Sequence, residues 1–371
     1  MNAVALPSAD GGCRMGPPSE RLGEAAWVPL LLLPALLTIL AGPAGASSES
    51  AVTNFAFWND YPLDRPLEER VYAAPPELIA YLVADNIKGG YDERPCAAAP
   101  DDAFLADMRG AIAELPTAVK RLVGRRLVGV FPVDDLGSTA YAELIRDAGG
   151  KAVAAFLALD VGVIDTPANT WATWRANTPF LPRNRWGVRV TIETEADDTR
   201  RNAMQYIMMH EFGHVAAVGT DIHPPWDRPF TDGPEALCAR YAFPCLSWTV
   251  DGEGHYRSLF EESFPLRAEV RFYKGPAERL PIEDAPAIYA DLDETNFVSL
   301  YGATTPYEDF AETLVSYVHT QMLKRPYRVD VVADGEVAQV LSSCWDTGRC
   351  DSKRAYLEEL LGRFEDPEGG R

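Results

Sequence analysis

Positive charge is scarce in this chain. Its 34 lysine and arginine residues are outnumbered by 55 aspartate and glutamate residues, which gives a formal net charge of −21 at pH 7. No block of lysine and arginine interrupts this excess of negative charge. Nucleic acids and anionic membrane surfaces repel such a chain, so we expect no nucleic-acid partner. We interpret the charge as a source of solubility.

Charged residues are absent from Ala25 to Ser48. Within this stretch, residues 27–41 form an apolar run rich in leucine, and Ala44-Gly45-Ala46 follows it. This is the pattern of a secretory signal peptide, so we predict a leader over residues 1–46 and a secreted or periplasmic protein that begins at Ser47. The run is short for a membrane span and contains two prolines. A retained leader that anchors the chain to the membrane is the alternative.

Cysteine is also scarce, and no two cysteines have C-x-x-C spacing, which argues against a cysteine metal site. Removal of the leader takes Cys13 away. Among the remaining cysteines, Cys238 and Cys245 lie close in sequence, and so do Cys344 and Cys350. In an oxidising compartment we predict that each of these pairs forms a disulfide. The last cysteine, Cys96, is then left over.

Histidine occurs five times in 371 residues, yet two of the five lie four residues apart in the pattern H-E-x-x-H, at His210-Glu211-Phe212-Gly213-His214. Apolar residues recur at three- and four-residue steps over residues 199–218, which predicts a buried helix. On a helix, residues four apart share a face, so both imidazoles can bind one metal ion. We predict zinc, with Glu211 as general base toward a zinc-bound water.

Two histidines do not complete a zinc site. Thr220 stands where a metzincin-type site would have its third ligand, so that arrangement is excluded. Asp221 and His223 lie close to this position and remain candidates. We expect the other two histidines, His255 and His319, to have no role at the metal.

A better candidate for the third ligand lies on a second predicted helix, residues 306–323, which has proline at its first position. Its Glu308 and Glu312 lie four residues apart and share a face. In one arrangement Glu308 binds the metal and Glu312 hydrogen-bonds a ligand histidine. In the other, Glu308 only caps the helix through Thr305, and Glu312 or Asp309 becomes the ligand.

These two motifs resemble those of the gluzincin metallopeptidases. The segment from Leu300 to Glu312, L-Y-G-A-T-T-P-Y-E-D-F-A-E, is similar to S-Y-G-x-T-N-x-x-E-x-F-A-E in the anthrax lethal factor protease domain and in bacterial putative zinc-binding metallopeptidases. The chain departs from that pattern at Leu300 and Thr305 and has a longer insertion between the motifs. The resemblance covers only the two motifs within residues 210–312. It implies His210, His214 and Glu308 as zinc ligands, Glu211 as general base, Tyr301 as a hydrogen-bond donor to the transition state, and Glu312 as the partner of a ligand histidine.

We predict an α+β, zincin-like fold with a small mixed sheet beside the active-site helix and a mostly helical C-terminal half. A single domain over residues 47–371 would comprise three parts. Residues 47–198 supply the sheet and its helices, residues 199–325 supply the metal site, and residues 326–371 form a hairpin and a helix.

Within this fold, the apolar runs 127–133 and 152–159 predict buried strands, and residues 141–147 are predicted to form a helix. Residues 186–193 alternate between apolar and polar, which predicts a half-exposed edge strand. That strand either binds an extended peptide or serves only as scaffold. Asp334-Gly335, between apolar runs, predicts a hairpin over residues 327–340.

The predicted function is that of a secreted zinc metallopeptidase, in which Glu211 assists the attack of a zinc-bound water on a peptide or protein substrate. Two alternatives remain. One is a secreted binding or structural protein with a non-catalytic zinc site, although such a site needs no general base. The other is a zinc hydrolase that acts on a non-peptide amide.

Overall fold

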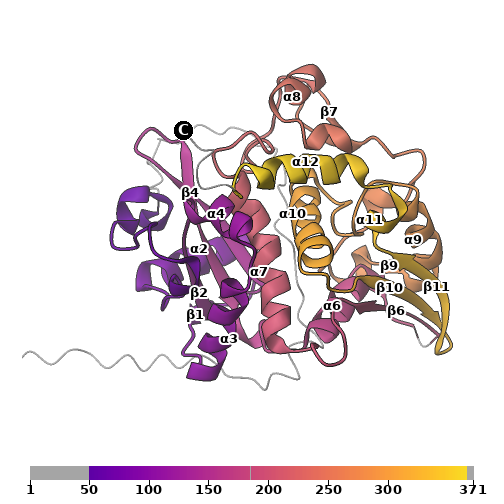
Figure 1. The fold of residues 1–371 in the computed structure, drawn as a ribbon, viewed down its shortest axis with the longest axis horizontal. Coiled ribbons are helices and arrows are strands. Elements are labelled where there is room, and N and C mark those ends of the chain that lie inside the picture. The colour runs from indigo at the N-terminus through magenta and orange to yellow at the C-terminus, as the bar shows by residue number, and fades with distance from the viewer. Residues whose placement is uncertain (1–49, 184, 366–371) are drawn as a thin grey trace, which may run out of the picture.

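The structure is a computed structural model that describes residues 50–183 and 185–365. It confirms the predicted α+β class, with a small mixed sheet and a mostly helical C-terminal region (Figure 1). The predicted leader, residues 1–46, lies outside the described residues. None of the helices in the described part of the chain combines the length and the apolar content of a membrane span.

The mixed sheet has the strand order β1-β2-β4-β3, in which β2 and β4 are parallel and both outer pairs are antiparallel. The two predicted buried strands are its central strands, β2 and β4. Alternate residues of β4 enter different cores: Leu157 belongs to the core around the metal helix, and Phe156 packs with Trp58 on the opposite face. Burial of both faces explains why these strands are continuous apolar runs. The strands are β1 Cys96–Ala97, β2 Leu127–Asp134, β3 Ala140–Arg146 and β4 Ala152–Asp160.

Strand β3 forms where we predicted a helix over residues 141–147, so that prediction was wrong. The segment pairs antiparallel with β4, with Tyr141 opposite Ala158. Gly137, with φ of 81°, turns the chain into the strand. Pairing with the next strand, β4, overrides the local helical pattern. β3 lies at the edge of the sheet, and its first residues line the main pocket.

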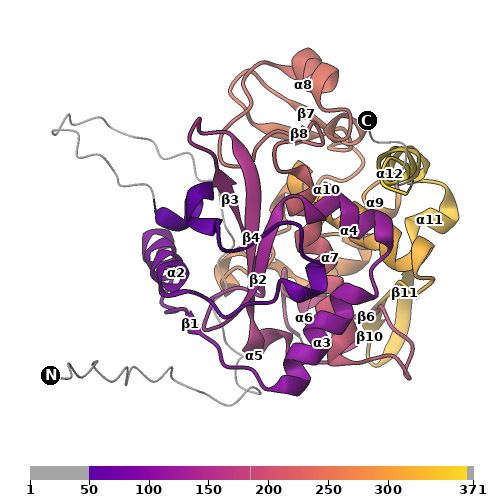
Figure 2. The same cartoon turned by 60° about the vertical axis from the view of Figure 1, so that its left-hand side comes forward.

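Helix α7, Arg200–Ala217, runs through the middle of the molecule and confirms the buried helix predicted over residues 199–218. It lies between the mixed sheet and α10 (Figures 1 and 2). Because neighbours cover it on all sides, most of its residues are buried and it has no broad polar face. The helices before it are α2 Pro76–Gly89, α3 Asp102–Ala113, α4 Thr117–Gly124, α5 Val161–Ile164 and α6 Ala168–Asn177.

A separate three-stranded antiparallel sheet has the order β11-β10-β6 and contains the predicted hairpin. As predicted, β6 is an edge strand, but its free edge is closed. Polar side chains of α6 bond to its backbone: Asn177 bonds both the N–H and the carbonyl of Val188, and Thr173 does the same for Val190. β6 therefore serves as scaffold rather than as a strand that adds a peptide. The strands are β6 Trp186–Thr191, β10 Arg328–Ala333 and β11 Glu336–Ser342.

The region after α7 is mostly helical and carries short strand pairs at its periphery. The predicted helix over residues 306–323 is α10 followed by one π-helical turn at Val318–Met322. Its helices are α8 Pro234–Arg240, α9 Ala285–Asp293, α10 Pro306–Tyr317, α11 Cys344–Thr347 and α12 Asp351–Gly362. Its short strands are β7 Trp248–Val250, which pairs with β8 Tyr256–Ser258, and β9 Leu280–Pro281, which pairs with β5 Phe180–Leu181 from the part of the chain before α7.

Both predicted disulfides are present. Cys238 is bonded to Cys245, next to α8, and Cys344 is bonded to Cys350, between α11 and α12. Cys96 is also disulfide-bonded, so the expectation that it would stay unpaired was wrong. Disulfides of this kind are typical of proteins in oxidising compartments.

Candidate metal centre

Helix α7 presents the H-E-x-x-H motif in its second half. Thr199 caps the helix, because its hydroxyl accepts a hydrogen bond from the N–H of Asn202 at 3.3 Å. Four residues separate His210 from His214, and their ring centroids lie 5.1 Å apart on one face of the helix. The four-residue spacing of the two histidines therefore places both imidazoles on one face of the helix, as the sequence predicted.

Helix α10 crosses α7 at very close range. Gly213 of the motif faces Ala311, and a Cβ atom at position 213 would lie 2.6 Å from the Cα of Ala311. Only glycine permits this approach. The contact brings the first turn of α10, which carries Glu308, up to the two histidines.

Three side chains converge on one point. One ligand atom from each of His210, His214 and Glu308 lies within 4.8 Å of the other two. Among the described residues, these three side chains form a group that could hold a metal ion. Glu308 Oε2 lies 3.1 Å from His210 Nε2 and 3.6 Å from His214 Nε2. This oxygen is buried and has no hydrogen-bond partner among the described residues. Two imidazole nitrogens and an unpartnered carboxylate oxygen fit the donor set of zinc.

Of the two hydrogen bonds in the capping alternative for Glu308, the structure contains one. Thr305 is the N-cap of α10, and its hydroxyl accepts a hydrogen bond from the backbone N–H of Glu308 at 3.1 Å. Among the described residues, the Glu308 carboxylate makes no return hydrogen bond to Thr305. The side chain instead reaches the histidines, as the first arrangement predicts.

Glu312, one turn further along α10, fixes the orientation of His210. Its Oε1 lies 2.7 Å from Nδ1 of His210 and 2.6 Å from a guanidinium nitrogen of Arg175, and its Oε2 accepts from the Ser299 hydroxyl at 2.6 Å. When Nδ1 of His210 donates to Glu312, Nε2 carries the lone pair that faces Glu308. Glu312 thus contacts one histidine of the candidate metal group through the ring nitrogen that faces away from Glu308.

Electrostatics favour a positive charge at this point. Burial alone lowers the pKa of His210, but the nearby Glu308 and Glu312 outweigh it and raise that pKa to about 10. Burial raises the pKa of Glu312, whereas Arg175 and His210 lower it to about 2, so Glu312 stays ionised. The buried carboxylate of Glu312 and the half-buried carboxylate of Glu308 therefore stabilise a cation beside the imidazoles.

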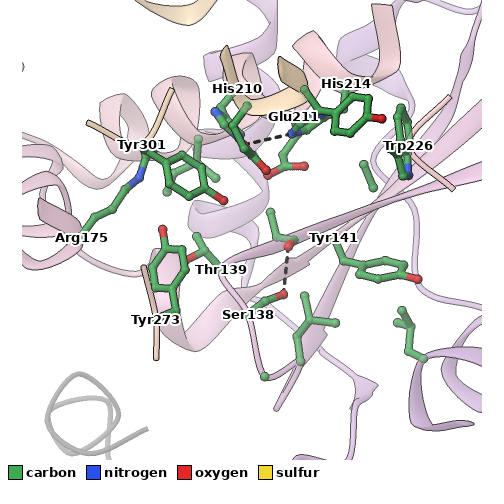
Figure 3. Close-up of a pocket in the computed structure, with 18 of the residues that line it drawn as sticks. Ser138, Thr139, Tyr141, Arg175, His210, Glu211, His214, Trp226, Tyr273 and Tyr301 are labelled. Carbon is green, nitrogen blue, oxygen red and sulfur yellow. Dashed lines mark hydrogen bonds and ion pairs between the residues drawn. The ribbon is translucent and has the colours of Figure 1, made fainter. Parts of the chain in front are cut away.

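A pocket of about 380 Å³ opens beside the group, and His210, Glu211 and His214 line it (Figure 3). Glu308 lines the same pocket. Burial raises the pKa of the Glu211 carboxyl. Glu211 thus lies on the pocket wall beside the candidate metal group.

Tyr301 lies on the same pocket wall. Its ring centroid is 5.6 Å from that of His210, and the Arg175 guanidinium lies 4.3 Å above its ring. Burial raises the pKa of the phenol well above its ordinary value, so the hydroxyl remains a donor. The structure brings Tyr301 to the group, next to the open side of the pocket.

The other candidate ligands lie outside the group. His223 is buried, and its Nδ1 contacts the carbonyl of Pro224 at 2.8 Å. Asp309 forms a buried ion pair with Lys353 at 2.5 Å, which removes it as a substitute for Glu308. Asp221 is not part of the group.

The remaining two histidines, His255 and His319, also have other contacts. His255 contacts the Asp251 carboxylate at 3.2 Å, and His319 contacts the carbonyl of Ile192 at 2.7 Å. Neither is part of the metal group, as expected.

Sequence reasoning missed several residues of the site. Arg175 lies on α6, far from both motifs, and holds Glu312 while it covers Tyr301. Ser299 and Trp226 likewise contact Glu312 and His214, respectively. No periodicity or spacing marks these positions, because each reaches the site through tertiary packing. The cluster of Trp171, Trp174 and Arg175 was the one visible signal.

Comparisons with family models, with curated proteins and with solved structures found no match to this chain. The site itself therefore carries the functional argument. It is a His–His–Glu group of the H-E-x-x-H type that could hold a metal ion, and it lies at the wall of a pocket.

Proposed function

We propose that the protein is a zinc-dependent peptidase of the gluzincin type, with His210, His214 and Glu308 as the zinc ligands. The observation that carries this proposal is the unpartnered, buried Glu308 Oε2 opposite two imidazole nitrogens, with Glu211 on the wall of the adjoining pocket. The resemblance of the two sequence motifs to gluzincins, and the α+β fold around the site, support it.

The chain's own residues have defined roles in this proposal. A zinc ion held here would polarise a substrate carbonyl and lower the pKa of a water in its open coordination position. Glu211 takes the proton of the attacking water and later returns it to the leaving amine. Tyr301 donates a hydrogen bond to the charge that develops on the carbonyl oxygen. Glu312 holds the His210 tautomer, and Arg175 holds Glu312.

Strand β3 supports a peptide as the substrate. Residues 138–142 line the pocket, and among the described residues β3 pairs with a strand, β4, on one side only. On the other side, one isolated bridge joins Arg146 to Asn54 at the far end of the strand. In the described part of the chain this edge has no strand neighbour near the pocket, although the carbonyl of Ala140 accepts a hydrogen bond from Ser138, and it can hydrogen-bond an extended peptide. This role moves from β6, where the sequence suggested it, to β3.

The two alternatives have less support. A zinc site that only stabilises the fold is normally closed by a fourth protein ligand, whereas this group lies open to a pocket that contains a carboxylate. A small non-peptide amide would leave the β3 edge and most of the pocket without a role. The disulfides support the further proposal that the chain is exported after cleavage of the leader near Ala46.

Zinc analysis and a peptide digest test the proposal. Purified protein should contain one zinc ion per chain and should cleave members of a mixed peptide library. Glu211→Gln keeps the shape and the zinc but removes the base, so the rate should fall by roughly 10²–10⁴-fold or more. Cleavage products are identified by mass spectrometry. A zinc-loaded wild-type protein that cleaves no peptide, or a Glu211→Gln variant with full activity, would exclude the proposed function.

A further inference from the structure

Tyr273 has an unusual backbone conformation at the edge of the pocket. Its φ is 61°, in the left-handed region that side chains other than glycine rarely adopt. Both neighbours hold this turn in place. Phe272 is buried and packs on the Tyr301 ring at 4.8 Å, and the carbonyl of buried Lys274 accepts a hydrogen bond from Arg279 at 2.6 Å. Strained conformations of this kind persist where the surrounding structure fixes them, and they cluster at functional sites.

The turn directs the Tyr273 side chain into the pocket. Its ring centroid lies 6.0 Å from that of Tyr301 and 5.9 Å from that of Trp174. Figure 3 shows the Tyr273 ring opposite Tyr301, on the same side of Glu211. Both tyrosines line the pocket together with Glu211. Two phenol rings therefore flank the open side of the metal group.

The two phenol hydroxyls have no hydrogen-bond partner among the described residues. Burial raises the pKa of Tyr273 to about 12, and the carboxylates of Glu312, Glu308 and Glu211 add to this, whereas Arg175 opposes it. The hydroxyl thus stays protonated at neutral pH and can donate. A hydroxyl that served only packing would gain nothing from a place on the pocket wall, since a phenylalanine ring would fill the same space.

We propose that the Tyr273 hydroxyl is a second donor to the substrate, which hydrogen-bonds the carbonyl oxygen beside Tyr301 as negative charge develops on it. The left-handed turn is then retained because it aims this hydroxyl at the reacting group. This assignment rests on the proposed peptidase function. Its physical basis is that preorganised donors stabilise developing charge more strongly than they stabilise the neutral substrate.

The test compares Tyr273→Phe with Tyr241→Phe. The first variant removes one hydroxyl and keeps the ring and the turn. The second makes the same change in the separate core cluster near α8, away from the pocket. Using the peptide that wild-type protein cleaves best, we expect kcat of Tyr273→Phe to fall by roughly 10–100-fold, a little less than the loss of a sole oxyanion donor, with KM nearly unchanged. Tyr241→Phe should match wild type in both constants.

A binding measurement separates this role from a loss of structure. Calorimetry with a phosphinic analogue of the same peptide, whose anionic oxygen mimics the transition state, should show roughly 10–100-fold weaker binding to Tyr273→Phe. Zinc content and the melting temperature of the metal-free protein should stay at wild-type values.

Equal affinities of wild type and Tyr273→Phe for the analogue, or equal kcat values, would overturn the assignment of Tyr273 while leaving the peptidase proposal in place. Equal losses for the analogue and for an uncharged, uncleaved peptide would also overturn it, because they would indicate packing. A wild-type protein that cleaves no peptide would overturn both proposals.

Discussion

Glu308 is the residue on which the metal assignment depends most. It lies one turn into a helix far from the histidines in sequence, and the sequence also allowed it to be a mere helix cap. The structure separates the two tasks: the Thr305 hydroxyl caps the helix, and the Glu308 carboxylate faces the histidines. The two residues can therefore be tested independently.

We expect Glu308→Ala to lose most of its zinc, because two imidazoles alone make an incomplete site. Thr305→Ala is the matched control. It should keep one zinc per chain and lose about 1 kcal/mol of unfolding free energy through the lost cap. Metal analysis after dialysis and urea unfolding measure the two effects. A Glu308→Ala protein with full zinc and activity would return the search for the third ligand to Asp221 and His223.

The contact between α7 and α10 sets the geometry of the site at the level of elements. Gly213 lies within the H-E-x-x-H motif but binds nothing; it provides the space into which Ala311 packs. Lys353 of α12 holds the other side of α10 through a fully buried ion pair with Asp309. α10 is thus fixed from two directions, and a shift of this helix would move Glu308 away from the histidines.

Gly213→Ala should therefore weaken both folding and metal binding. The added methyl forces the helices apart, and overpacking of this kind costs about 1–3 kcal/mol. Gly124→Ala in α4 is the control, because nothing lies within 4 Å of its added Cβ. It should be neutral or stabilise by about 0.4–1 kcal/mol. Urea unfolding and chelator competition for zinc give the two quantities. Wild-type zinc affinity in Gly213→Ala would show that the close approach is not required.

At the scale of the whole molecule, buried histidines limit acid stability. His319 lies in the core between the three-stranded sheet and α7, and its Nδ1 has no hydrogen-bond partner among the described residues. Burial lowers its pKa from 6.5 to about 4. The folded protein therefore keeps His319 neutral at a pH where the unfolded chain has already bound a proton.

This difference predicts a loss of stability as the pH falls from 6.5 toward 4. The pKa of His319 is lower in the folded protein than in the unfolded chain. Each unit of pH decrease in this window therefore lowers the free energy of unfolding by up to about 1.4 kcal/mol, and His319 costs no stability above pH 6.5. His319→Gln keeps a donor for the Ile192 carbonyl and does not titrate. Urea unfolding of metal-free wild type and variant at about pH 7 and about pH 5 should show a steeper decline for wild type. Parallel declines would contradict a buried neutral His319.

The sequence by itself determined the features that depend on local spacing. The helical period predicted the H-E-x-x-H helix and placed His210 and His214 on one face, because four residues nearly complete a turn. Continuous apolar runs predicted β2 and β4, and short cysteine separations predicted both disulfides. Each of these signals lies within one segment of the chain.

Only the tertiary structure decided which glutamate reaches Nε2 of both histidines, and which strand edge lies at the pocket. Residues 140–146 form strand β3 because they pair with β4. The outer edge of β6 is not free, because side chains of α6 hydrogen-bond to its backbone. Arg175 joined the site through an ion pair with Glu312, 137 residues away in the chain. Such contacts depend on how separate elements pack together, and packing across long separations leaves no period or spacing in the sequence.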